Sequence, residues 1–180
     1  MKSRDIAIVG ICLAVGAILR IIANAVSGFA IVANPVIALY CLAIILVRPK
    51  ISEALGIGLV AGILSMLISH SLFPPANLIS EPFGALVCVL VYMVIAKRVP
   101  LAEAGSTFIA TLASGLSFLL VCIFVIAFTP FLDLPNKYET LISFFGTLAV
   151  FVVVPTAFVN GIITQVLYYP TSKMIMKDEE

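Results

Sequence analysis

Apolar residues along the chain gather into six long runs that short polar segments separate. A hydrocarbon core about 30 Å thick needs about 20 apolar residues per helix, so each run approaches the length of a transmembrane helix. The runs predict helices over residues 5–25, 29–47, 53–73, 82–96, 102–128 and 141–169. We therefore expect an all-α membrane protein, a bundle of six transmembrane helices that forms a single domain over residues 1–180.

The composition supports lipid as the solvent of this chain. Hydrophobic residues make up 63% of the sequence and charged residues only 11%, whereas a soluble domain carries about 25% charged residues. A net charge of +1 gives no basic field for nucleic acid. The four cysteines lie far apart in apolar runs and there is one histidine, so we expect neither a metal site nor a cofactor.

Basic residues alternate between the two sides of the predicted bundle. Short basic connections separate the second run from the third and the fourth run from the fifth, whereas residues 73–81 and 129–140 contain one basic residue, Lys137. The basic residues that fall on the first side are Lys2, Arg4, Arg48, Lys50, Lys97, Arg98, Lys173 and Lys177. The positive-inside rule then predicts that both termini are cytoplasmic, in a multi-pass protein of a prokaryotic plasma membrane.

Small residues recur at helical spacing in two runs. The first run contains Gly10 and Ala14, and the third contains Ala54, Gly58 and Gly62. Residues four apart share one helix face, and small side chains let another backbone approach closely. Two interpretations remain open, namely packing inside the bundle and docking of another membrane subunit.

Seven candidate polar side chains lie within the apolar runs or beside their ends. A polar group at membrane depth is costly and is typical of residues that face a cavity. The seven are Arg20, Asn24, Asn34, His70, Asn77, Glu81 and Asn160. With the termini in the cytoplasm, the first six reach the outer third of the bundle from four different elements. A few convergent polar groups in an apolar concavity favour a pocket for a small-molecule substrate.

Each of these residues allows more than one role. Arg20 either binds a carboxylate or extends to lipid headgroups. Glu81 pairs with an ammonium or with Arg20, or it complements a helix N-terminus before Pro82. His70 is a ligand contact or an interfacial capping residue, and Asn160, which lies too deep to reach headgroups, bonds to a neighbouring helix or to a ligand. Candidate aromatic walls are Phe29, Phe73, Tyr138, Phe144 and Phe145.

Motifs of catalysis and energy supply are missing from the sequence. It contains no Walker A loop, no HExxH and no GxSxG. Acidic residues are nearly absent from the apolar runs, which gives a proton relay little to work with, and no inverted repeat is visible. These absences favour a substrate-binding subunit that other proteins energise, and not an enzyme.

Several stretches together resemble the substrate-binding S components of energy-coupling factor (ECF) transporters, most closely the tryptophan-transport group. They are Gly16-Ala17-Ile18-Leu19-Arg20, Arg48-Pro49-Lys50, Pro75-Ala76-Asn77-Leu78-Ile79-Ser80-Glu81-Pro82, and Val154-Pro155-Thr156-Ala157-Phe158-Val159-Asn160 followed by Tyr169-Pro170. The resemblance covers the whole chain. It implies a partnership with a coupling transmembrane protein and two ABC ATPases, with the S component capturing substrate outside and toppling to release it. The small-residue faces would then be the docking surface.

The chain departs from that group at three pocket positions. Arg20 stands where a histidine-like residue is expected, Glu81 where a basic residue is expected, and Asn34 where an acidic residue is expected. This exchange of charges favours a changed substrate. Tryptophan is our first hypothesis, helped by the absence of tryptophan from the chain; a vitamin or vitamin precursor is the second, a self-sufficient small transporter or channel the third, and a structural membrane subunit the fourth.

Overall fold

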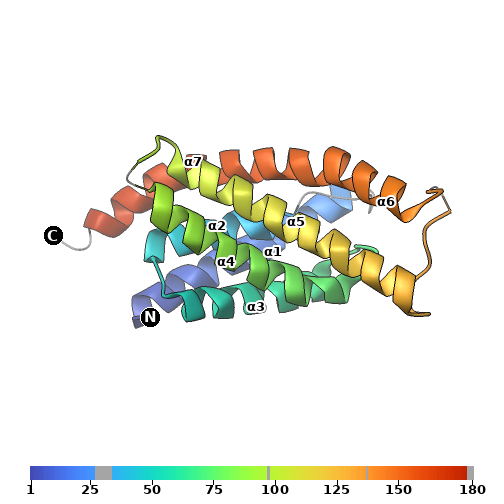
Figure 1. Ribbon diagram of the computed structural model, residues 1–180. Coiled ribbons are helices and arrows are strands. Elements are labelled where there is room, and N and C mark those ends of the chain that lie inside the picture. The colour runs from blue at the N-terminus through green and yellow to red at the C-terminus, as the bar shows by residue number, and fades with distance from the viewer. Residues whose placement is uncertain (27–33, 97, 137, 178–180) are drawn as a thin grey trace.

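The computed structural model describes residues 1–26, 34–96, 98–136 and 138–177, and within these ranges helices are the only regular secondary structure. Figure 1 shows them as a bundle of roughly aligned helices. The helices are α1 (Ser3–Val26), α2 (Pro35–Val47), α3 (Ile51–Ile68), the short 3₁₀ helix η1 (Pro74–Ala76), α4 (Asn77–Ile95), α5 (Ala102–Phe128), α6 (Leu141–Leu148), the π-helical segment η2 (Ala149–Val153) and α7 (Val154–Lys177).

Five helical segments are long and apolar enough to cross a membrane, namely Ser3–Val26, Ile51–Ile68, Pro74–Ile95, Ala102–Phe128 and Leu141–Ile175. The prediction of an all-α, multi-pass membrane protein is therefore confirmed. The remaining apolar helix, α2, has only 13 residues. At 1.5 Å per residue its length is about 20 Å, which is shorter than the hydrocarbon core.

Helix α2 lies at the centre of the bundle. It packs against α1, α3, α4, α5 and α7, and every residue from Pro35 to Ile45 is buried. Such a helix has no polar face because no side of it meets solvent. The other helices surround it and expose large apolar side chains outward, among them Ile11, Leu67 and Phe158, as a surface in contact with lipid requires.

The two ends of the bundle differ in the segments that they contain. Both termini lie at one end, together with the connections that follow α2 and α4, and the connections that follow α3 and α5 lie at the other end (Figure 1). The described basic residues Arg48, Lys50 and Arg98 thus lie at the same end as the chain termini. This arrangement agrees with the alternation of basic connections in the sequence.

Three predicted boundaries differ from the structure by five residues or more. Helix α3 ends at Ile68 instead of residue 73, because Ser69 adopts an extended conformation. Helix α4 begins at Asn77 and contains Pro82 internally; its buried polar first turn interrupts the apolar run, so the sequence suggested a start five residues too late. The last predicted helix extends to Lys177 and is interrupted by η2. Residues 29–33 of the second predicted helix lie outside the described residues.

The small-residue faces have separate environments. Ala54, Gly58 and Gly62 are buried, and a Cβ on Gly58 would lie 2.6 Å from the Cα of Pro82 in α4. The burial of these residues and the close approach of Gly58 and Gly62 to α4 favour the interpretation of packing inside the bundle. Gly10 and Ala14 of α1 are instead exposed, and no atom lies within 4 Å of a Cβ built on Gly10.

Candidate ligand pocket

A cavity of about 380 Å³ lies at the end of the bundle opposite the termini. The C-terminal part of α1, the beginnings of α2 and α4, the middle of α5 and the region from α6 to α7 all contribute to its walls. Most of its surface is apolar, although about half of the residues that line it have polar side chains. This size and character are typical of a small-molecule site.

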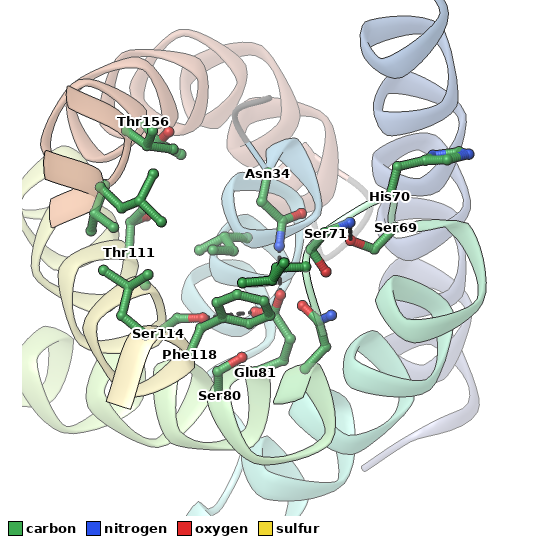
Figure 2. Close-up of a pocket in the computed structure, with 18 of the residues that line it drawn as sticks. Asn34, Ser69, His70, Ser71, Ser80, Glu81, Thr111, Ser114, Phe118 and Thr156 are labelled. Atoms are coloured by element: carbon green, nitrogen blue, oxygen red, sulfur yellow. Dashed lines mark hydrogen bonds between the residues drawn. The ribbon is translucent and has the colours of Figure 1, made fainter. Parts of the chain in front are cut away.

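Glu81 occupies a central position in this cavity. Its side chain is 1% exposed, and its two carboxylate oxygens accept hydrogen bonds from different helices. Asn34 Nδ2 donates to Oε1, and Ser114 Oγ donates to Oε2 at 3.1 Å. Figure 2 shows Asn34 and Ser114 approaching the Glu81 carboxylate from two sides. A carboxylate can accept about four hydrogen bonds, so Glu81 retains capacity for a ligand donor.

Asn34 is fixed by interactions at both its side chain and its backbone. Its Oδ1 caps α2 by accepting from the Val36 N–H at 3.2 Å, which satisfies one of the free donors of that helix end. Asn160 Nδ2 donates to the Asn34 carbonyl oxygen at 3.1 Å and to Thr111 Oγ1 at 3.3 Å. Asn160 is fully buried and does not line the cavity, so it supports the pocket from behind, bonding to neighbouring helices.

Arg20 supplies a positive charge to the same cavity. Its side chain is 7% exposed, and Nη2 donates to Ser69 Oγ at 2.9 Å. Among the described residues, Nε and Nη1 are buried and have no hydrogen-bond partner, and Arg20 forms no salt bridge with Glu81. Because an unpaired charge is costly at membrane depth, this guanidinium is suited to an anionic ligand group. Its burial does not agree with the alternative that it extends to headgroups.

Asn24, His70 and Asn77 line the rim of the pocket. Asn24 Nδ2 donates to the Ile68 carbonyl oxygen at 3.1 Å and lies 3.3 Å from His70 Nδ1. His70 is exposed, and in Figure 2 its ring points away from Glu81. Asn77 Nδ2 donates to the Pro74 carbonyl oxygen at 2.7 Å. These side chains therefore stabilise the segment between α3 and α4 that borders the cavity.

Apolar side chains form the rest of the wall. Tyr138 and Phe144 line the cavity and pack edge to face, with ring centroids 5.2 Å apart. Among the other predicted aromatic walls, Phe73 and Phe145 pack in the adjacent apolar cluster instead of lining the cavity, and Phe29 lies outside the described residues. The remaining apolar lining includes Ile37, Phe118, Leu119, Leu148, Val152 and Val153.

Sequence reasoning missed several polar residues of the site. Ser69, Ser71, Ser80, Thr111, Ser114 and Thr156 all line the cavity. Within α5 a signal was present: Thr107, Thr111 and Ser114 follow the spacing of one helix face, and all three are buried. Hydroxyl groups are common in membrane helices, which is why single serines and threonines did not stand out.

The arrangement is suited to binding a small molecule. Six of the seven predicted polar residues line one cavity, and the seventh, Asn160, supports it. The His70 ring points away from Glu81 and Ser114 in Figure 2. A buried cation, Arg20, and a buried anion, Glu81, face the same cavity without forming a salt bridge.

Comparisons with known proteins give no identification: no family model, curated protein or solved structure matches the chain.

Proposed function

We propose that this chain is the substrate-binding S component of an ECF-type importer and that it captures a small amphipathic molecule, best represented by tryptophan, from outside the cell. The observation that carries the proposal is the unpaired, buried Arg20 guanidinium in a largely apolar cavity. A buried guanidinium that forms no salt bridge within the described residues favours a ligand that supplies an anionic group.

The membrane topology in this proposal has six crossings. Five are the long apolar helices, and the sixth is the short central helix α2, which the other helices enclose and which therefore need not match the bilayer thickness by itself. The basic connections gather at the end with the termini. The positive-inside rule then assigns that end to the cytoplasm of a prokaryotic plasma membrane and directs the pocket outward.

The ligand would be bound through both of its charges. Arg20 would bind a carboxylate, and Glu81, already oriented by Asn34 and Ser114, would accept from an ammonium group. The apolar wall with Phe118 and Phe144 would cover an aromatic ring. A cavity of about 380 Å³ lies at the lower end of the range for ligand sites, about 300–1,000 Å³, which favours a ligand of amino-acid size.

The energy for uptake would come from partners. The sequence has no Walker A loop, so a coupling transmembrane protein and two ABC ATPases would complete the transporter. Gly10 and Ala14 on the exposed face of α1 would allow close approach of the coupling protein.

Titration of tryptophan into the purified protein, followed by the ligand's own indole fluorescence, tests the function directly. The chain contains no tryptophan, so a shifted indole signal belongs to the ligand alone. A saturable blue shift at micromolar concentration is expected, together with its loss in Glu81→Gln. No shift would reject tryptophan, and mass spectrometry of co-purified small molecules would then decide whether a vitamin-like carboxylate occupies the pocket. Uptake into liposomes by the chain alone would instead reject the S-component function.

A further inference from the structure

A second cavity, of about 520 Å³, lies at the opposite end of the bundle, beside the termini. The beginning of α1, the end of α2 and the last turns of α7 form its walls. Helices α1 and α7 each pack against α2, and the backbones of their described residues do not approach each other closely. The cavity therefore occupies the space that these two helices leave beside the end of α2.

Positive side chains dominate the polar part of this cavity. Lys2, Arg4 and Arg48 line it together with one acidic residue, Asp5. Asp5 Oδ2 accepts a hydrogen bond from the Lys2 backbone N–H at 2.8 Å. The only salt bridge in the described part of the chain joins the N-terminal amine to Glu53. No carboxylate there neutralises the Lys2 or Arg48 side chain.

Arg48 is held in place by both its backbone and its side chain. It follows the last residue of α2 in a left-handed conformation, with φ of 50°, and its backbone N–H donates to the Ile44 carbonyl oxygen at 2.8 Å. Its guanidinium carbon lies 5.9 Å from the centre of the Tyr92 ring, within range of a cation–π interaction. The charge is thus positioned by the fold at the end of the central helix.

Apolar surface continues from the charged part of the cavity along the outside of the bundle. Ile8, Leu46 and Ile175 line the cavity, and next to them α1 and α7 expose Ile11 and Met174, which are 65% and 70% exposed. A basic recess at the end of the bundle, between helices long enough to span a membrane and bordered by apolar surface, matches an anionic lipid. A free anion would use the charges but leave the apolar surface without a partner.

We propose that this cavity binds the phosphate group of an anionic phospholipid, with Arg48 and Lys2 contacting the phosphate and the acyl chains lying on α1 and α7. This site is separate from the ligand pocket and does not depend on the proposed transport function. If no phospholipid binds here, the result of the tryptophan titration is unaffected. If no tryptophan binds in the ligand pocket, the lipid measurement is likewise unaffected.

The test compares the full chain with the double variant Lys2→Gln/Arg48→Gln. Protein in neutral detergent is titrated with short-chain phosphatidylglycerol, and native mass spectrometry measures the bound fraction; phosphatidylcholine and inorganic phosphate are the other ligands. A matched control, Arg98→Gln/Lys173→Gln, removes the same charge at the same end of the bundle but outside the cavity. We expect phosphatidylglycerol affinity to fall about tenfold or more in the cavity variant, on the scale of two lost basic contacts, and to change little in the control.

Four results would overturn the proposal. An equal loss of phosphatidylglycerol affinity in both double variants would mean diffuse attraction to a basic surface. An unchanged phosphatidylglycerol affinity in the cavity variant would mean that Arg48 and Lys2 do not contact the lipid. Inorganic phosphate binding as tightly as the lipid would make this an anion site without a lipid. A truncated variant that lacks Asp178, Glu179 and Glu180 provides the fourth result. If only this variant binds the lipid, the acidic residues compete with the lipid phosphate for the cavity. Melting temperatures in neutral detergent verify that all variants fold.

Discussion

Replacement of Arg20 by methionine separates ligand binding from folding more clearly than any other change in this chain. Methionine keeps much of the length and apolar stem of arginine but removes the charge. If the guanidinium is present to bind a ligand, its loss weakens binding while the ligand-free protein becomes no less stable. If Arg20 is a structural residue, its loss lowers the stability of the ligand-free protein. The two roles therefore predict opposite results for the same variant.

The expected loss of ligand affinity in Arg20→Met follows from the hydrogen bonds of Arg20. In the ligand-free protein it makes one side-chain hydrogen bond, to Ser69, while Nε and Nη1 are buried without a partner in the described residues. A hydrogen bond to a charged group contributes about 1.5–3 kcal/mol. Two such bonds to a carboxylate, reduced by the loss of ligand solvation, leave about 3 kcal/mol, which corresponds to roughly a hundredfold in Kd.

The stability of the ligand-free protein should stay the same or rise. A buried charge without compensation destabilises the folded state, and an apolar residue of similar volume in its place is often neutral or stabilising. We therefore expect Arg20→Met to have a melting temperature equal to or above that of the wild type in the absence of ligand, and to lose the thermal shift that the ligand gives to the wild type.

Indole fluorescence titration and thermal unfolding in the same detergent provide both measurements. Arg98→Met, which removes an arginine from the connection after α4 at the opposite end of the bundle, is the matched control. It should change neither the ligand affinity nor the melting temperature. Arg20→Lys should bind with intermediate affinity, because an ammonium restores the charge but not the planar donor group. Wild-type affinity in Arg20→Met, accompanied by a fall in melting temperature, would refute the reasoning and make Arg20 a structural residue.

Four further changes test other parts of the structure. Glu81→Gln should weaken tryptophan at least about tenfold while leaving indole-3-propionate, which lacks the ammonium, nearly unaffected; an equal loss for both ligands in titration would contradict the role of Glu81. Asn160→Ala should destabilise the fold by about 1–3 kcal/mol in denaturant unfolding and also weaken binding, because it releases the Asn34 backbone; unchanged binding would separate Asn160 from the site. Gly58→Leu should prevent stable folding, because a Cβ at this position meets α4. Gly10→Leu should leave the melting temperature unchanged but abolish co-purification with a coupling protein. An intact complex in Gly10→Leu would exclude this face of α1 from docking.

Much of this fold could be predicted because lipid imposes a simple pattern. An apolar run of sufficient length has to become a helix, and the span over residues 102–128 coincides with α5. The prediction failed where polar residues belong to a helix, as with Asn77, Ser80 and Glu81 at the start of α4. A hydropathy pattern treats such a turn as a connection. In the structure the turn is helical, and its polar side chains line the cavity.

The candidate site was partly predictable for a related reason. Charged and amide side chains stand out against an apolar background, so Arg20 and Glu81 were found from the sequence, and topology brought them to the same end. Their partners could not be found in this way. That Ser69 contacts Arg20 and Ser114 contacts Glu81 depends on how α3 and α5 rotate against their neighbours, which no periodicity within one helix can reveal.

The short central helix α2 also contributes its end to the wall of the cavity. At about 20 Å, α2 is roughly 10 Å shorter than the hydrocarbon core that the longer helices can cross. Asn34, which caps the N-terminal end of α2, and Ile37 both line the cavity. Insertion of one helical turn before Pro35 should therefore displace the Asn34 cap together with the amide group that holds the Glu81 carboxylate, and so reshape the cavity from its wall.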